Sequence, residues 1–275
     1  MPVQATVRAG DHVAARFGSD AAFADLAVEF ACNGVTARGQ VLLFVPRRLR
    51  RLIGDRLAAS APLRAAARDG HVRVVDPRDV QLAGGFDAAR LHTAYHDATQ
   101  AALIAGYPGL WVVVDMSWAR PSVVDPEALV AFEAASITLF TEATLTALCA
   151  FDTRVFTAKQ VFRVCQAHPV ADAAGFGHRA TPDGCGLALS GETDRSNALA
   201  WKALLAALAP DHHVVDISGM SFLSVRAMAD LGAAARVLLR PLTVRATRAQ
   251  ATHLRLLHLD DLITIDVLPP QTTPV

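Results

Sequence analysis

Short apolar runs alternate with helical stretches between Val13 and Gln166, and this alternation constrains the fold more than any other feature of the sequence. Such alternation is typical of a parallel sheet whose two faces are covered by helices. The clearest predicted strands are Gln40 to Val45, Val72 to Val75, Leu110 to Asp115 and Ala143 to Phe151. The helices predicted between them are Ala21 to Cys32, Pro46 to Ser60, Phe86 to Ala105 and Pro126 to Thr141.

The first predicted helix carries recognisable start and stop signals. Ser19 or Asp20 can cap its N-terminus, and Asn33-Gly34 can end it. Its aromatic side chains, Phe23 and Phe30, fall at helical spacing, so we expect them in the core and not around a cofactor.

Composition restricts the function classes. The chain has 275 residues, 52% hydrophobic and 19% charged, which suits a packed protein of one large or two ordinary domains. The formal net charge is zero, so we expect no nucleic-acid binding, and partners should be proteins or small molecules. No run approaches the roughly 20 apolar residues that span a bilayer, and no signal segment opens the sequence, so we expect a cytoplasmic protein without membrane association.

The periodic pattern breaks once, between His168 and Gly186, in a stretch rich in turn-forming residues. We therefore predict a first domain over residues 1–170, a linker over 171–183 and a second domain over 184–275. The second domain repeats the strand and helix alternation on a smaller scale as far as about Val267, and includes a helix predicted at Ser196 to Leu208.

The second domain contains a predicted switch from strand to helix. A β-branched run ends at Ile217, Gly219 would allow a sharp turn, and Ser221 or Ser224 could cap a helix. Together with Leu187-Ala188-Leu189-Ser190-Gly191-Glu192-Thr193-Asp194, this stretch resembles the STAS domain of anti-sigma factor antagonists and sulphate transporter tails.

That resemblance implies a surface that binds an anti-sigma factor or a kinase-like protein. Arg226 occupies the place where the family has a phosphorylated serine, and Ala227 replaces the following glycine, so we expect no phosphorylation there. Phosphorylation of Ser221 or Ser224 by a divergent kinase stays open beside helix capping. The partner-binding residues implied are Ser218, Ser221, Ser224 and Arg226.

Three segments of the first domain resemble the MEDS domain, a sensory module of methanogen and methylotroph regulators of the DcmR type. They are Asp11-His12-Val13-Ala14-Ala15-Arg16-Phe17, Val114-Asp115-Met116-Ser117-Trp118-Ala119, and Leu148-Cys149-Ala150-Phe151-Asp152-Thr153-Arg154-Val155-Phe156 with His168-Pro169 downstream. In the first segment Ala15 and Phe17 replace residues that the family often has.

The same domain is similar to RecA and KaiC-type ATPases that have lost their phosphate loop. The stretch Phe17 to Phe23 lies where that loop would be, but it contains no Gly-Lys-Ser or Gly-Lys-Thr. Asp20 would also place a negative charge near the helix N-terminus, where phosphates bind. We therefore predict an α/β fold with a RecA/KaiC-like parallel sheet, a smaller α/β STAS domain, and no enzyme activity.

The candidate ligand site follows from strand ends and from the sensory resemblance. Asp115 ends one predicted strand and Asp152 the next, and the carboxyl edge of a parallel sheet is where α/β folds bind ligands. Trp118 could stack on a small molecule, and a structural role for these residues stays open. The predicted ligand-binding set is His12, Arg16, Asp115, Ser117, Trp118, Asp152 and Arg154.

We predict no metal site and no cofactor. His92 and His96 could share one helical face, but neither they nor His12 and His168 have an acidic or thiol ligand at a motif-like spacing. A group of arginines in the second predicted helix favours a solvated face, with an anion-binding or docking patch as the alternative; its members are Arg47, Arg48, Arg50, Arg51 and Arg56.

The sequence as a whole favours a signalling protein in which the sensory domain controls the STAS domain and thereby transcription. Two alternatives stay open: a nucleotide-binding RecA-like protein with residual activity, and a homodimeric scaffold without a ligand. The ligand, the partner and the coupling between the domains are not determined by these patterns.

Overall fold

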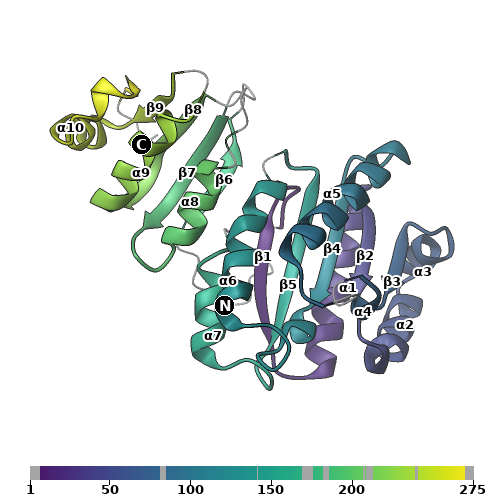
Figure 1. Cartoon of the computed structure of the whole chain (residues 1–275). Helices are drawn as coiled ribbons and strands as arrows, with labels where there is room; N and C mark the ends of the chain where they lie inside the picture. The colour runs from purple at the N-terminus through teal and green to yellow at the C-terminus, as the bar shows by residue number, and fades with distance from the viewer. Residues whose placement is uncertain are drawn as a thin grey trace, which may run out of the picture.

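The computed structural model describes residues 7–80, 85–140, 142–168, 176–181, 186–206, 208, 213–238 and 241–269 (Figure 1). Two five-stranded sheets form the frame. The first sheet is entirely parallel, with strands in the order β1-β5-β4-β2-β3. Its strands are β1 (His12–Phe17), β2 (Gln40–Phe44), β3 (Val72–Val75), β4 (Leu110–Asp115) and β5 (Leu145–Asp152).

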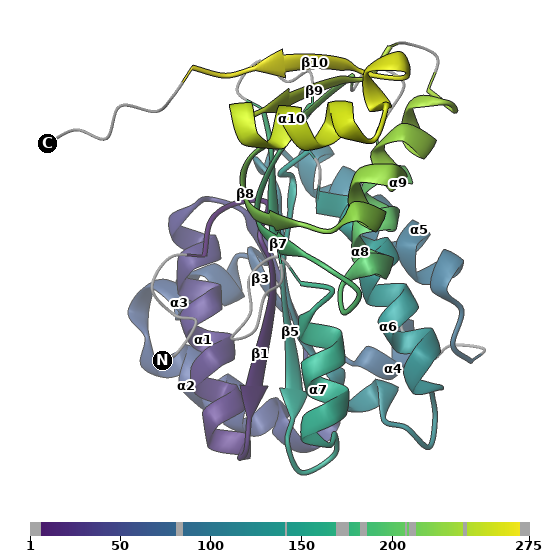
Figure 2. The same cartoon turned by 90° about the vertical axis from the view of Figure 1, so that its left-hand side faces the viewer.

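Helices cover both faces of this sheet, as the alternating pattern predicts (Figure 2). One face carries α1 (Asp20–Thr36), α2 (Arg50–Ala59) and α3 (Ala61–Arg68). The other carries α5 (Ala88–Ile104), α6 (Pro126–Ala135) and α7 (Ala158–Cys165), while the short α4 (Pro77–Val80) follows β3. No described helix combines the length and apolar character needed to cross a bilayer.

Side chains along the central strands alternate between two buried cores. In β1, Val13 and Ala15 face the core under α1, whereas Ala14 faces the core under α6. In β5, Leu148 belongs to the first of these cores and Cys149 to the second. This period of two fixes which residues of neighbouring strands can meet on the α6 side.

The predicted end of the first helix is wrong. Asn33 and Gly34 lie inside α1, which continues to Thr36, and the chain leaves the helix through Arg38 in the left-handed conformation at φ 60°. Gly34 instead allows close packing, since a Cβ there would lie 2.8 Å from Val41 Cγ2 and 3.0 Å from Trp111 Cγ. The predicted cap is confirmed at Ser19, whose hydroxyl accepts a hydrogen bond from the Ala22 amide.

Two predicted helices are interrupted. The stretch predicted from Pro46 to Ser60 begins with the 3-10 turn η2 (Arg47–Leu49) before α2. The stretch predicted from Pro126 to Thr141 ends α6 at Ala135 and continues as the 3-10 turn η4 (Ser136–Phe140). A further 3-10 turn, η3 (Met116–Ala119), follows β4 directly.

The second sheet is mixed, with strands in the order β10-β9-β8-β7-β6. Only β6 runs antiparallel to its neighbour. The elements of this domain are β6 (Phe176–Ala180), β7 (Gly186–Thr193), α8 (Ala198–Ala206), β8 (Val214–Leu223), α9 (Val225–Ala235), β9 (Thr243–Ala246), α10 (Arg248–Leu256), η5 (Leu259–Asp261) and β10 (Thr264–Val267).

The predicted linker over 171–183 is only partly a connection. β6 lies inside it and pairs with β7, so residues 176–180 belong to the second sheet. Residues 171–175 and 182–183 lie outside the described residues. The turn-forming composition of this segment therefore led to the prediction of a linker where part of the chain forms an edge strand.

The predicted sharp turn at Gly219 is also wrong. β8 continues through this residue to Leu223, with register shifts against β7. Gly219 permits a close approach of the two strands, since a Cβ there would lie 2.7 Å from the Leu189 carbonyl oxygen. Of the two caps predicted for the next helix, Ser224 is the one observed. Its hydroxyl accepts a hydrogen bond from the Ala227 amide at the start of α9.

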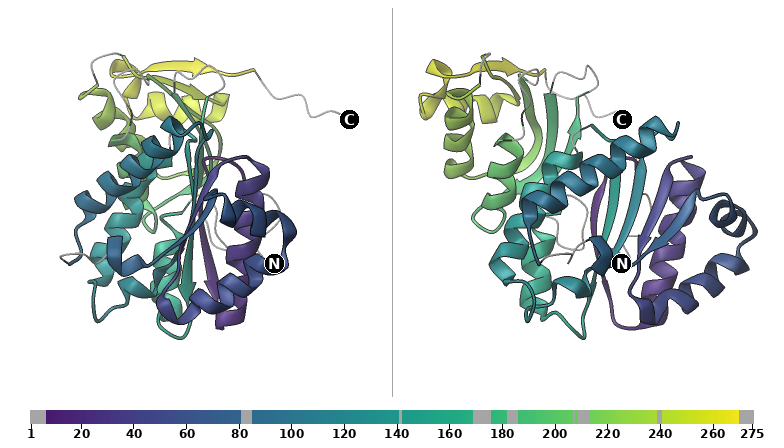
Figure 3. Two further views of the ribbon diagram at one scale, coloured as in Figure 1. Left: turned by 90° about the vertical axis from the view of Figure 1, so that its right-hand side faces the viewer. Right: turned by 45° about the vertical axis from the view of Figure 1, so that its right-hand side comes forward.

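The two sheets are joined by packing between helices. α6 and η4 lie against α8 (Figure 3), and Ala134 and Ile137 share one apolar core with Trp201 and Leu204 of α8. The Trp201 indole N–H in turn donates to the Ala227 carbonyl oxygen of α9, at 3.2 Å. α6 therefore contacts both the core of the first sheet and the core of the second.

We predict opposite effects of one substitution at two helical glycines of the first domain. Gly34→Ala should lower the free energy of unfolding by about 1–3 kcal/mol, because the new Cβ overlaps buried side chains of β2 and β4. Gly54→Ala should raise it by up to about 1 kcal/mol, because alanine is the better helix former and a Cβ there has no neighbour within 4 Å. Urea unfolding measures both, and equal effects at the two sites would contradict this packing.

Candidate functional site

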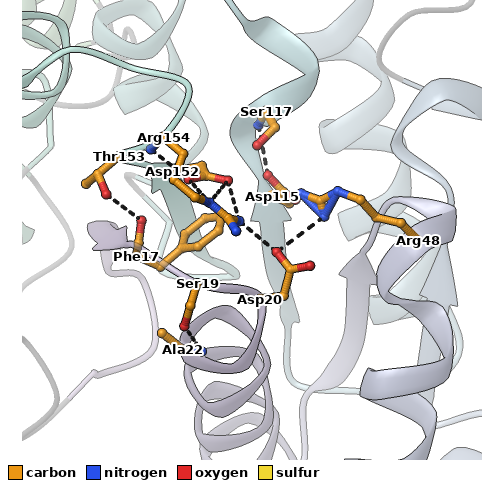
Figure 4. A network of polar contacts seen from close by, with 10 residues as sticks. All are labelled: Phe17, Ser19, Asp20, Ala22, Arg48, Asp115, Ser117, Asp152, Thr153 and Arg154. Carbon is orange, nitrogen blue, oxygen red and sulfur yellow. Dashed lines mark hydrogen bonds and ion pairs between the residues drawn. The ribbon is translucent and has the colours of Figure 1, made fainter.

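Two aspartates mark the carboxyl edge of the first sheet, as the sequence predicts. Asp115 ends β4 and Asp152 ends the adjacent β5 (Figure 4). The Ser117 amide donates to Asp115 Oδ1 at 2.9 Å and so fixes that carboxylate at the start of η3. Both side chains are buried, so each needs compensating donors.

Arg154 supplies these donors to Asp152. Its Nε lies 2.9 and 3.1 Å from the two carboxylate oxygens, and its Nη2 lies 2.7 Å from Oδ2. The same Nη2 donates to Asp20 Oδ1 at 2.6 Å. Partial burial works to raise the pKa of Asp152, but the Arg154 hydrogen bonds prevail and lower it. Asp152 and Arg154 therefore form an ion pair at this strand end.

Arg48 links Asp20 of α1 to Asp115 of β4. Its guanidinium lies 3.7 Å from Asp20 Oδ1 and 3.5 Å from Asp115 Oδ2. Burial raises the pKa of Asp115, against the opposing effects of Ser117 and Arg48. Carboxylates and guanidinium groups thus occupy this edge together, and Asp20 stands in the first turn of α1, where a phosphate would otherwise be stabilised.

The predicted ligand-binding set divides in the structure. Asp115, Ser117, Asp152 and Arg154 come together at the carboxyl edge. Arg16 is exposed on β1, and Trp118 is buried in the core with its ring 6.1 Å from that of Phe86. His12 lies in a different place, at the beginning of β1 and on the α6 side of the sheet.

His12 belongs to a buried cluster that the sequence analysis did not find. Three elements and the segment after α7 contribute one side chain each: His12 from β1, Glu133 from α6, Cys149 from β5, and His168 three residues beyond α7. One potential ligand atom from each residue lies within 4.8 Å of the others. Sequence spacing offered no acidic or thiol partner for the histidines, whereas the fold supplies both, so these four residues could hold a metal ion.

Burial drives every member of this cluster towards its neutral form. Burial, with the charge of His178 in β6, lowers the pKa of His12 to about 3. Burial, with the charge of His12, lowers the pKa of His168 to about 3. The same burial raises the pKa of Glu133 and of Cys149.

A cavity of about 20 Å³ lies beside the cluster, enough for one or two water-sized groups. Apolar and aromatic side chains supply most of its wall, with the cluster at one end. Its lining includes His12, Tyr95, Phe132, Glu133, Phe140 and Cys149. An apolar wall with a few polar groups is typical of ligand pockets, but this cavity is much smaller than a pocket for a drug-sized molecule.

His92 and His96, the two histidines that the sequence places on one helix face, do not belong to the buried cluster. His92 Nε2 lies 2.9 Å from the Ser136 hydroxyl, and its ring stacks on Phe132, which lines the cavity. His92 therefore supports the wall of the cavity. His96 is exposed on α5 and is not one of the four residues of the buried cluster.

The predicted partner-binding residues lie along the end of β8 and the start of α9. Ser221 is exposed and donates to the Gly191 carbonyl oxygen, Ser218 is half-buried, and Ser224 is the helix cap. Arg226 is exposed and pairs with Asp230 one turn later. Two apolar side chains beside them, Phe222 and Val225, are 52% and 65% exposed.

Several arginines of the group that follows β2 form ion pairs with carboxylates. Arg47 and Arg50 lie within ion-pair distance of the buried Asp76, together with Arg78. Arg56 pairs with Asp25 across to α1. These contacts favour the structural interpretation of the group over an anion-binding patch.

A comparison with protein families matches residues 11–169 to MEDS, the methanogen/methylotroph, DcmR sensory domain. The match spans the whole parallel sheet and all four members of the buried cluster. No curated protein matches the chain.

We predict a pH-dependent contribution from Asp76. Hydrogen bonds from Arg78, with Arg47, lower the pKa of this buried carboxyl to about 2. A lowered folded-state pKa stabilises the fold above the unfolded-state pKa, and that stability is lost as the pH falls from about 4 to about 2. The difference in unfolding free energy between the wild type and Asp76→Asn should therefore shrink over this range.

Urea unfolding at several pH values measures this difference. Asp55→Asn, which removes an exposed carboxylate from α2, is the control and should show a smaller pH-dependent difference. A difference for Asp76→Asn that stays constant down to pH 2 would contradict the role of the ion pairs.

Proposed function

Because the chain belongs to the MEDS family of sensory domains over residues 11–169, we propose that it is a non-catalytic signalling protein with a ligand-binding first domain and a partner-binding second domain. The family assigns a sensory role in signalling or regulation. The finer assignments, a RecA-like first domain and a STAS second domain, are parts of this proposal.

The carboxyl edge of the first sheet supports a sensor without nucleotide chemistry. The loop before α1 has no lysine, and Asp20 in the first turn pairs with both Arg48 and Arg154. A nucleotide phosphate would have to displace these pairs and approach the Asp20 carboxylate. We therefore assign the edge to holding α1, β4 and β5 together.

The cavity beside His12 is the better ligand site. It is buried, mostly apolar and bordered by a thiol, a carboxyl and an imidazole. Its volume restricts a ligand to a molecule of very few heavy atoms unless the walls move. The ligand class proposed is therefore a small molecule or ion, not a nucleotide.

The observation that carries the proposal is the double role of α6. Phe132 and Glu133 line the cavity, whereas the next residue, Ala134, packs in the core shared with α8. η4 continues this arrangement, with Leu139 and Phe140 at the cavity and Ile137 in the shared core. A ligand that shifts α6 would therefore act directly on α8.

Trp201 extends the contact chain from α8 to α9. Its hydrogen bond to the Ala227 carbonyl oxygen reaches the first turn of the helix that carries Val225 and Arg226. A ligand in the cavity would thus favour one position of the start of α9 over another. Such coupling is reciprocal, so a bound partner would raise or lower the affinity for the ligand by the same factor.

The end of β8 and the start of α9 would form the output surface. We propose an anti-sigma factor or kinase-like protein as its partner, in line with the STAS resemblance of these residues. Phe222 and Val225 supply exposed apolar contact area, and Ser221 and Arg226 border it. Arg226 carries no hydroxyl, so control would pass through the first domain and not through phosphorylation at that place.

A ligand that binds the cavity should stabilise the full chain and change hydrogen exchange in α8 and α9. We expect a thermal-shift screen of small organic molecules and ions to give a hit, since saturation at 100 times the dissociation constant adds about 2.7 kcal/mol. The hit should be lost in Leu139→Trp, which fills the cavity, and kept in Ile104→Trp, which changes a surface 87% exposed.

Three results would contradict this proposal. Stabilisation by a magnesium nucleotide that is unaffected by Leu139→Trp would favour the nucleotide-binding alternative. Stabilisation by a small ligand without altered exchange in α8 or α9 would show that the domains are not coupled. A mass that rises with concentration, with no hit at all, would favour the dimeric scaffold.

The output surface can be tested separately. Phe222→Ser and Val225→Asp should each weaken binding of the native partner at least tenfold, because the exposed apolar area lies at the centre of the proposed contact. Cross-linking in the native cell with mass spectrometry identifies the partner, and titration of the purified partner measures the affinity.

Val237→Asp is the matched control, since Val237 is 81% exposed just beyond the far end of α9. It should leave binding unchanged. Equal binding by all three variants, or a partner without an anti-sigma or kinase-like domain, would contradict the assignment of this surface.

A further inference from the structure

Four buried side chains with complementary metal-binding chemistry meet on the α6 side of the first sheet. His12, Glu133, Cys149 and His168 are between 1% and 6% exposed. They come from residues far apart in the sequence, so no local structural requirement brings them together. Burying two imidazoles, a carboxyl and a thiol in one place is costly unless something satisfies them.

The protein alone does not satisfy them. Among the described residues, His168 Nε2 has no hydrogen-bond partner, and its position facing the cluster would allow a metal ion to satisfy it. His12 Nδ1 and Glu133 Oε1 also lack a partner, but the atoms of these two residues that face the cluster are Nε2 and Oε2. Glu133 Oε2 lies 3.4 Å from His12 Nε2 and 3.4 Å from His168 Nε2, longer than ordinary hydrogen bonds. Cys149 Sγ lies 3.5 Å from His12 Nε2.

These separations are those of ligands around a tetrahedral metal ion. Zinc binds nitrogen and oxygen at about 2.0–2.1 Å and sulfur at about 2.3 Å, which puts tetrahedral N–O pairs about 3.3–3.4 Å apart and N–S pairs about 3.5–3.6 Å apart. These three distances agree with these values, and all four ligand atoms lie within 4.8 Å of one another. One ion between the four atoms would draw the more distant ligand atoms closer together.

The surroundings orient one histidine for this role. His168 Nδ1 lies 2.7 Å from the Val164 carbonyl oxygen, so Nδ1–H donates outward and the Nε2 lone pair faces the cluster. A backbone carbonyl behind a metal-binding imidazole is a common way to fix the tautomer. The His12 ring is held by stacking on Phe140, with the centroids 4.3 Å apart.

Charge and ligand type select the metal. A carboxylate and a thiolate together neutralise one divalent cation, so the filled site could remain buried without net charge. Two imidazoles and a thiolate suit zinc and its neighbours in the first transition row, not magnesium or calcium, which prefer oxygen ligands. We propose that His12, Glu133, Cys149 and His168 bind one divalent transition-metal ion of the zinc class in a tetrahedral site.

This site shares His12, Glu133 and Cys149 with the wall of the proposed ligand cavity, but the metal content that tests it is measured independently of the signalling proposal. Four protein ligands leave no open position, so the ion would be structural or sensed, not catalytic. It would tie β1, β5, α6 and the segment after α7 together, and Glu133 is the ligand that α6 contributes.

The test uses the full chain without a histidine tag, stripped of metal and titrated with Zn²⁺ and Co²⁺. We expect one equivalent of Zn²⁺ by elemental analysis and a higher melting temperature on reloading. Co²⁺ should give the ligand-field bands of a tetrahedral ion and a thiolate-to-cobalt charge-transfer band. Cys149→Ser should abolish the charge-transfer band, and His168→Ala should lower the affinity at least about 100-fold.

Matched variants separate the cluster from other thiols and imidazoles. Cys165→Ser changes another buried cysteine and His96→Gln an exposed histidine of α5, and both should keep full binding. Glu133→Gln preserves the shape of its side chain and should weaken binding even if Cys149→Ser fails to fold. Less than a tenth of an equivalent in the wild type, or a charge-transfer band that persists in Cys149→Ser, would overturn the proposal.

Discussion

The burial of the parallel sheet on both faces is the constraint on which the rest of the structure depends. Each central strand must place successive side chains into two separate apolar cores, so polar residues within it need partners. His12 in β1 and Cys149 in β5 fall on the same face, and Glu133 of α6 meets them there. The adjacent strands β4 and β5 end in Asp115 and Asp152, two buried carboxylates that are paired with arginines.

The aspartates at the carboxyl edge and the buried cluster differ in how their polar groups are compensated. At the carboxyl edge, guanidinium groups compensate the aspartates, and the network links α1 to β4 and β5. In the cluster no described arginine or lysine compensates Glu133, and burial favours neutral forms of all its members. The aspartates of the edge are therefore paired with arginines, whereas the cluster has a buried His168 Nε2 without a hydrogen-bond partner.

α6 connects this chemistry to the second domain because successive residues of a helix point in different directions. Glu133 turns towards the cluster, and Ala134 turns towards Trp201 of α8. The small side chain of Ala134 lets the two helices approach, and the Trp201 hydrogen bond continues to α9. The proposed coupling between the sensory domain and the surface around Val225 would use these contacts.

The sequence by itself determined the alternating parallel fold of the first domain, the positions of β3 and β4, the caps at Ser19 and Ser224, and the pair of aspartates at the sheet edge. Those features follow from local periodicity and from side chains near each helix start. It misjudged Gly34 and Gly219, because whether a glycine ends an element or permits close packing depends on neighbours such as Trp111 and the Leu189 carbonyl. Only the tertiary structure brought His12, Glu133, Cys149 and His168 together, since residues so distant in the chain meet through strand order and helix packing, which no spacing in the sequence encodes.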